Sequence, residues 1–165
     1  MQLFVNIIGI SIFFGAPSVR AEALATLPIQ RLSLDMALKA ARASLAACRE
    51  AGVNVAVTIV DRGGHPQVVL RDTLAMDLTL TISRQKAYTA MSFNSPTGDL
   101  EGRFKGAYSV PKIDGVIVAR GGLPVTGAGA ILGGIGVSGA PSGELDEKCA
   151  RAGLEAIAFE LEGME

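Results

Sequence analysis

The segment 121–147, GGLPVTGAGAILGGIGVSGAPSGELDE, constrains the fold more than any other part of this chain. Residues 130–137 carry no polar side chain, which predicts a strand that is buried on both faces. Gly133, Gly134 and Gly136 lie inside this strand, where glycine costs conformational entropy. Their presence indicates that either another backbone or a flat ligand approaches the strand closely.

The same strand contains a six-residue match to the dinucleotide-binding pattern G-x-G-x-x-G, namely Gly134-Ile135-Gly136-Val137-Ser138-Gly139. A dinucleotide site needs those glycines in a turn after the first strand, followed by a helix and by an acidic residue that closes the next strand. Here the glycines lie within a strand near the end of the sequence, and Glu155 falls inside the one helix that follows. The match therefore does not predict a nucleotide site.

Composition excludes several functional classes. The 165 residues suit one domain with an ordinary core. The formal net charge is −1 and no basic run is present, which argues against a nucleic-acid partner. A single histidine, with no Cys-x-x-Cys and no His-Glu-x-x-His, argues against a zinc or di-iron site. No Ser-His-Asp or Cys-His arrangement can be assembled either.

Residues 1–25 have the character of a secretory signal peptide. Leu3–Gly15 is almost wholly apolar and is followed by small residues, with Val19-Arg20-Ala21 as one candidate cleavage site. The apolar run is short for a bilayer span, although no Lys or Arg precedes it. The alternative is a buried or disordered N-terminal segment. We expect a periplasmic or secreted protein with one domain over residues 30–165 and no membrane attachment after cleavage.

Cys48 and Cys149 each lie on the apolar stripe of a predicted helix. In an exported protein a disulfide between them would persist, and it would join the first and last helices if these are neighbours. The alternative is two buried thiols that pack as small hydrophobic groups. The sequence leaves both interpretations open.

Periodicity and turn signals predict the order α-β-β-α-β-β-β-α. Ser33 and Gly52 bound a helix over 33–51, Asp77 begins a second helix that ends near Phe93, and Ser142 begins the last one, with Phe159 on its inner stripe. Strands are predicted at 53–59, 66–71, 116–119, 123–126 and 130–138, with turns at 61–64 and 127–129 and an irregular loop at 97–112. Because the strands form hairpin-joined runs, the fold class is α+β with a mostly antiparallel five-stranded sheet and packed helices.

Short motifs occur in a fixed order along the chain. They are VAVTIVDRGGH at 55–65, RD at 71–72, RQKAYTA at 84–90, PT at 96–97, GGLP at 121–124, GVSG at 136–139 and DE through AGL at 146–154. Together they resemble the haem-binding GlcG/HbpS-like family, whose module also forms the C-terminal domain of PduO-type proteins. The resemblance runs in register from Ser33 to Ile157.

This resemblance implies a profilin-like α+β domain that assembles into homo-oligomers, which are octamers in several members. Several members bind haem, and some are linked to haem degradation or iron sensing. Many members carry an Arg-Met-Asp-Gly-Ala type of segment after the hairpin, where this chain has Arg71-Asp72-Thr73-Leu74-Ala75. The resemblance therefore implies the fold more directly than the identity of the ligand.

His65 is the strongest candidate for a cofactor ligand. It lies at a hairpin turn beside two glycines, and imidazole is a common axial ligand of haem iron. The alternative is a solvent-exposed turn residue. Weaker candidates are Tyr88, Tyr108, Met91 and Thr97, with core packing as the default interpretation for Tyr88 and Met91.

Arg71 and Lys86 are candidates to bind carboxylates, either haem propionates or those of a small acid. For Lys86 the alternative is an exposed position on a helix. Gly121, Gly122 and Pro124 form a corner between strands, which is either structural or lines a pocket with backbone N–H groups.

Three functions are compatible with these observations. The first is an exported haem- or tetrapyrrole-binding homo-oligomer, in which the glycine-rich strand and the His65 turn make room for a planar ligand. The second is a binder or enzyme for a small organic acid that uses Arg71, Lys86 and the Gly121–Gly122 corner. The third is a structural assembly protein.

Overall fold

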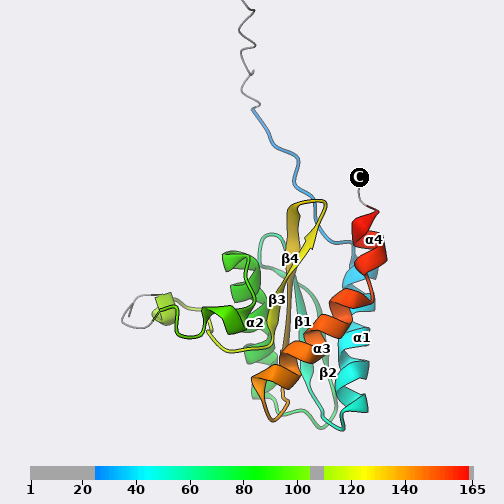
Figure 1. Cartoon of the computed structure of the whole chain (residues 1–165), viewed down its shortest axis with the longest axis vertical. Helices are drawn as coiled ribbons and strands as arrows, with labels where there is room; N and C mark the ends of the chain where they lie inside the picture. The colour runs from blue at the N-terminus through cyan, green and yellow to red at the C-terminus, as the bar shows by residue number, and fades with distance from the viewer. Residues whose placement is uncertain (1–24, 105–109, 164–165) are drawn as a thin grey trace, which may run out of the picture.

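The computed structural model describes residues 25–104 and 110–163, which form one four-stranded sheet between helices (Figure 1). The main elements are α1 (Leu34–Glu50), β1 (Ala56–Asp61), β2 (Pro66–Arg71), α2 (Leu78–Phe93), β3 (Gly122–Gly127), β4 (Ala130–Ser138), α3 (Gly143–Glu155) and α4 (Ala158–Glu162). Two short 3-10 helices, η1 (Thr97–Leu100) and η2 (Val110–Lys112), lie between α2 and β3. The α+β class and the antiparallel sheet are confirmed.

The signal-peptide prediction concerns residues 1–25, of which 1–24 lie outside the described residues, as does Tyr108. Within the described ranges, no helix combines the length and the apolar character needed to cross a bilayer.

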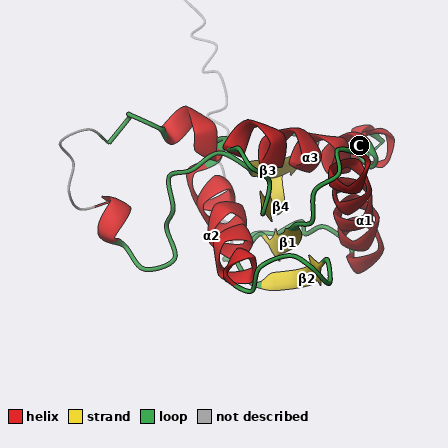
Figure 2. Ribbon diagram, turned by 90° about the horizontal axis from the view of Figure 1, so that it is seen from below, coloured by secondary structure: helices red, strands yellow, loops and turns green. Residues whose placement is uncertain are grey.

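The sheet has the order β2-β1-β4-β3, and every neighbouring pair is antiparallel. Helices α1 and α3 cover one face and α2 covers the other, as Figure 2 shows end-on. The central strands β1 and β4 are therefore enclosed on both sides, and all six residues of β1 are buried. The main core lies on the α1–α3 side and includes Val57, Ile59, Leu132 and Ile135.

The glycines of β4 are explained by the backbone of α2. A Cβ atom built on Gly136 would lie 2.1 Å from the Ser83 carbonyl oxygen, and one on Gly134 would lie 2.3 Å from the Ala87 carbonyl oxygen. Any side chain at these positions would hold the helix away from the sheet. The backbone alternative is therefore confirmed, and the expectation that these glycines make room for a planar ligand is wrong.

The predicted strand at 116–119 does not form, so the sheet has four strands instead of five. The segment is held by a side chain: the Ile117 N–H donates to Thr89 Oγ1 of α2 at 2.9 Å. A short apolar run cannot reveal from sequence whether its backbone will pair with a strand or with a helix side chain. The profilin-like description stays a prediction.

The last helix is interrupted, which moves Phe159 out of the core. The backbone of Ile157 has φ −116° and ψ 5°, and this non-helical residue separates α3 from α4. The break rotates the apolar stripe, so Ile157 and Leu161 are buried while Phe159 is 86% exposed. The predicted inner position of Phe159 is therefore wrong.

The predicted helix boundaries are otherwise close to those observed. The Ser33 and Ser142 hydroxyls accept from the N–H groups of Met36 and Leu145, as N-caps do. Asp77 precedes α2 but makes no capping hydrogen bond. Asn94 ends α2 in the left-handed region, with φ 45°.

Cys48 and Cys149 form a disulfide between α1 and α3, with an S–S distance of 2.04 Å. Both residues are fully enclosed in the core between these helices. Close to the bond, a Cβ built on Gly153 would lie 2.1 Å from Ser44 Oγ, so the two helices pack with little space between them. Of the two interpretations of the cysteines, the disulfide is the one observed.

Candidate functional site

A groove of about 900 Å³ opens between the β1–β2 turn and the outer side of α2. Three segments form its walls: the hairpin, with His65 and Val69; α2, with Leu80, Arg84 and Tyr88; and the loop after η2, with Asp114. The mixture of apolar side chains with a few polar groups is typical of small-molecule sites. This groove is the candidate site because it contains the only histidine of the chain.

Asp61 organises the turn that carries the histidine. Its Oδ1 atom accepts from the N–H groups of Gly63 at 2.8 Å and His65 at 2.9 Å. Its Oδ2 atom accepts from Arg31 Nη1 at 3.0 Å. Burial disfavours the charged carboxylate, but these two N–H groups, Arg31 and His65 outweigh that effect and hold the pKa of Asp61 below its usual 3.8.

The His65 imidazole lies at the rim of the groove, and its side chain is 81% exposed. Its Nδ1 atom is 3.5 Å from Asp61 Oδ1. A carboxylate beside Nδ1 orients many metal-binding imidazoles and leaves Nε2 for the metal. The position agrees with both interpretations of the sequence, an exposed turn residue and a ligand on an open site, so coordination of iron stays a prediction.

Tyr88 forms the inner wall of the groove. A Cβ on Gly64, which has φ +82°, would lie 2.7 Å from Tyr88 Cδ2, and one on Gly115 would lie 3.7 Å from Tyr88 Cδ1. The ring thus packs between two glycines, one from the hairpin turn and one from the loop after η2. Glycine at position 64 allows both the left-handed turn and this contact.

The other weak candidates face inward. Met91 is buried against Val60 and Ala87, in the smaller core cluster on the α2 side. Thr97 Oγ1 accepts from the Gly122 N–H at 2.9 Å, which ties η1 to the beginning of β3. Neither residue lines the groove.

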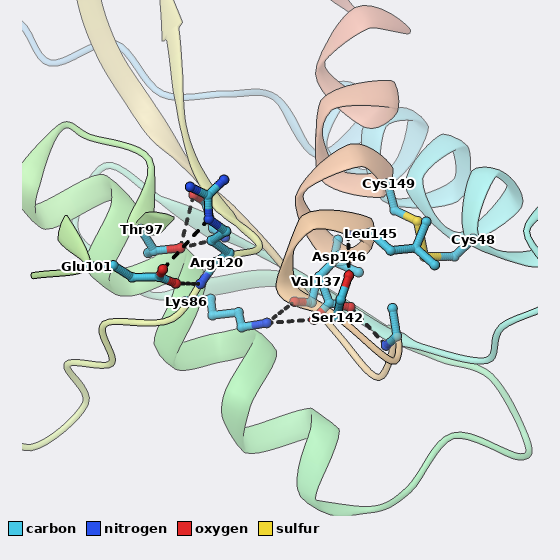
Figure 3. Close-up of polar contacts among 12 residues, drawn as sticks. Cys48, Lys86, Thr97, Glu101, Arg120, Val137, Ser142, Leu145, Asp146 and Cys149 are labelled. Atoms are coloured by element: carbon cyan, nitrogen blue, oxygen red, sulfur yellow. Dashed lines mark hydrogen bonds and ion pairs between the residues drawn. A yellow bond between two sulfur atoms is a disulfide. The ribbon is translucent and has the colours of Figure 1, made fainter. Parts of the chain in front are cut away.

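Lys86 lies in the interior and not on an exposed helix position, so that alternative is wrong. Only 4% of Lys86 is accessible, and its Nζ atom donates to Asp146 Oδ2 at 2.7 Å and to the Val137 carbonyl oxygen at 2.9 Å (Figure 3). Asp146 Oδ1 in turn accepts from the Ala140 N–H at 3.0 Å. Burial raises the pKa of Asp146, against the opposing influence of Lys86 and Ala140.

The Gly121–Gly122 corner packs around this ion pair. A Cβ on Gly121, which has φ +116°, would lie 2.8 Å from Lys86 Nζ, and one on Gly122 would lie 2.4 Å from the Lys86 carbonyl oxygen. The structure therefore brings Lys86, Gly121 and Gly122 together, as the motifs suggested, but they surround Asp146. None of the three lines either of the two described pockets.

The remaining predicted residues are separate from this cluster. The Arg71 guanidinium donates to the Ala75 carbonyl oxygen in the loop after β2. Pro124 lines a second depression of about 400 Å³ between the β3–β4 turn and helices α3 and α4. The described residues contain no group of three or more His, Cys, Asp or Glu side chains that could hold a metal ion.

Sequence reasoning did not single out Asp61 and Arg84, although both fall within the quoted motifs. The signal for Arg84 was its spacing of four residues from Leu80 and from Tyr88, which places the three side chains on one stripe of a helix. The signal for Asp61 was its position before two glycines in a turn, where an Asp side chain accepts from the backbone two residues on.

The charge on Asp61 should stabilise the protein only above its pKa. Asp61→Asn keeps an oxygen that accepts from Gly63 and His65 but loses the charge, so at neutral pH we expect a loss of about 1 kcal/mol in the free energy of unfolding. Because the folded-state pKa is lowered, the wild-type advantage is present above about pH 3.8 and is lost as the pH falls through the folded-state pKa. Urea unfolding of both proteins across this range tests it, and a difference that does not depend on pH would contradict it.

Comparison with known proteins agrees with this architecture. A family model described as haem degrading protein HbpS-like matches residues 32–155. A crystal structure of HbpS from Streptomyces reticuli with two Glu-to-Asp substitutions is 41% identical, with a TM-score of 0.78 over 87% of this chain and 98% of that one. A crystal structure of a PduOC–haem complex is 27% identical, with a TM-score of 0.73 over 77% of this chain and 95% of that one.

An uncharacterised 15.0 kDa protein of Citrobacter freundii, from the dhaT–dhaS intergenic region, is 31% identical over 116 residues. The match covers 67% of this chain and 82% of that protein. The family model, the ordered motifs and the shared fold together lead to one conclusion: this chain belongs to the HbpS-like family.

Proposed function

We propose that this protein binds haem or a related tetrapyrrole in the groove between the β1–β2 turn and α2, with His65 as the iron ligand. The observation that carries the proposal is the position of His65 on the rim of a groove whose volume lies in the usual range for cofactor sites, about 300–1,000 Å³. Membership of the HbpS-like family and similarity to a PduOC–haem complex support it.

Each part of the groove has a role in this proposal. Asp61 holds the turn, and its carboxylate, 3.5 Å from Nδ1, would leave Nε2 of the imidazole for the iron. Val69, Leu80 and Tyr88 offer apolar surface to the body of a macrocycle. Haem iron supplies the redox chemistry of the bound cofactor, while the protein sets its orientation and exposure. An open groove with an exposed iron-binding side chain suits uptake and release of the cofactor.

We also propose that the protein is exported and handles or degrades haem outside the cytoplasm. The character of residues 1–25 and the disulfide between Cys48 and Cys149 support export. The description of the matching family supports a role in haem degradation. Exposed apolar side chains at Leu74, Met76 and Leu78 support self-association, with an octamer as the form that the family resemblance suggests.

A hemin titration tests the proposal. The wild-type protein should shift the Soret band saturably, and His65→Ala should weaken binding roughly tenfold or more and change the position of the band. Arg62→Ala is the matched control, because Arg62 lies in the same turn but does not line the groove. A spectrum that follows free hemin would contradict the proposal, as would equal binding by wild type and His65→Ala.

The organic-acid alternative is less well supported by the geometry. Lys86 already binds Asp146, and backbone atoms of α2 close the space beside Gly122. If hemin does not bind, thermal shift against a panel of small carboxylates tests this alternative, since a ligand of the native state raises the melting temperature.

A further inference from the structure

We propose, on the basis of the haem-binding function above, that Arg84 is the residue that binds the carboxylate edge of the ligand. It would make the groove selective for tetrapyrroles that carry free propionates. The sequence assigned this role to Arg71 and Lys86, but among the described residues only Arg84 presents a guanidinium or ammonium group in the groove.

The position of Arg84 follows from helix geometry. Residues of α2 that are two apart point in directions about 200° different, so Lys86 faces the interior while Arg84 faces outward. Arg84 is exposed, and it lies one helical turn from both Leu80 and Tyr88 on the stripe that lines the groove. The helix therefore lines the groove with Leu80, Thr81, Gln85 and Tyr88, and Arg84 is the one cation among them.

Arg84 forms no ion pair with any other residue in the described part of the molecule. Arg31, Arg49, Arg120 and Arg151 form ion pairs with described carboxylates. Arg84 forms none, as is also true of Arg42, Arg62, Arg71 and Arg103, but of these five Arg84 alone lines the groove. An arginine fork binds a carboxylate through two parallel hydrogen bonds, and the guanidinium stays charged at any physiological pH. A free guanidinium in a cofactor-sized groove thus matches an anionic group of the ligand.

Asp114 and His65 would also orient that ligand. Asp114, on the loop after η2, is the one carboxylate that the described residues contribute to the groove, and it would repel a propionate. His65 lies on the hairpin wall, where it would meet the iron. In such a complex Arg84 would bind a propionate, Tyr88 and Leu80 would contact the apolar body of the macrocycle, and His65 would bind the iron.

The test compares hemin with hemin dimethyl ester, in which the propionate charges are blocked, in one solvent mixture. The wild-type protein should bind hemin on the order of fivefold more tightly than the ester, the upper value for an exposed ion pair. Arg84→Gln should lose this preference by weakening hemin binding alone. Arg42→Gln, on the exposed side of α1 and outside the groove, should keep it. His65→Ala should lower the affinity for hemin and for the ester by the same factor, so the ratio of the two affinities should not change.

The outcomes separate this inference from the proposed function. If hemin binds in a His65-dependent manner but Arg84→Gln retains the preference for hemin, the role of Arg84 is wrong and haem binding stands. If Arg84→Gln weakens hemin and the ester equally, Arg84 acts through packing and the inference is also overturned. If wild type binds neither ligand saturably, both proposals fail together.

Discussion

Lys86→Met is expected to lower the free energy of unfolding by about 3–5 kcal/mol, the usual cost of removing one partner of a buried ion pair. The variant would leave the Asp146 carboxylate, itself only 4% accessible, without its cation, and the Val137 carbonyl oxygen without a donor. The methionine side chain matches the length of the lysine stem, so the change tests the charge and not the volume. Urea unfolding at fixed protein concentration measures the loss.

The pH dependence identifies the cause. Burial already raises the pKa of Asp146, and without Lys86 its charged form loses its strongest opposing interaction. A raised folded-state pKa means that stability falls as the pH rises from the unfolded value through the folded one. The deficit of Lys86→Met should therefore be larger at neutral pH than at acidic pH, where the Asp146 carboxyl is protonated and no buried charge is left unpaired.

Two further variants act as controls. Lys39→Met removes the exposed pair with Glu160 and should leave stability close to that of the wild type. Lys86→Met combined with Asp146→Asn removes the unpaired charge, while the Asn oxygen still accepts from Ala140. This double variant should be more stable than Lys86→Met alone. The interpretation fails if Lys39→Met and Lys86→Met cost the same.

Removal of the disulfide should have a comparable effect. The bond joins residues separated by 101 positions and therefore restricts the unfolded chain strongly. For a loop of this size the expected loss is about 3–5 kcal/mol. The double variant Cys48→Ala with Cys149→Ala places no thiol or hydroxyl group at these two positions, and denaturant unfolding measures its stability.

Reduction of the wild-type protein separates the covalent bond from the packing of the sulfur atoms. Dithiothreitol should bring the wild type close to the stability of the double alanine variant and should leave that variant unchanged. The reduced form should keep the fold, because the disulfide is one contact within a large buried core cluster that also includes Ala40, Leu45 and Ile135. A wild-type protein with confirmed free thiols and unaltered stability would contradict the prediction.

The candidate site was predictable only in part. The His65 turn could be predicted because Asp61, Gly63 and Gly64 act within the turn itself, and such local roles appear in short sequence patterns. The roles of Lys86 and Arg84 were not visible, because they depend on which side of α2 meets the sheet. The weak polarity contrast of that helix, with buried Thr79, Ser83 and Thr89, hides its orientation.

Local interactions along the chain were enough to predict most of the secondary structure. Caps at Ser33 and Ser142, the left-handed Asn94 and the glycine turn after β3 each depend on neighbouring residues alone. The ordered motifs were enough for the family. These features need no knowledge of distant contacts, and the α+β class followed from their order.

Distant contacts decided the rest. Thr89 of α2 holds the 116–119 segment out of the sheet, Asp146 of α3 holds Lys86 in the interior, and the backbone of α2 fills the space beside Gly134 and Gly136. Each of these outcomes joins residues that are far apart in the sequence. The residue type determines which interactions a side chain can make, but the packing of helix against sheet determines which partner it meets.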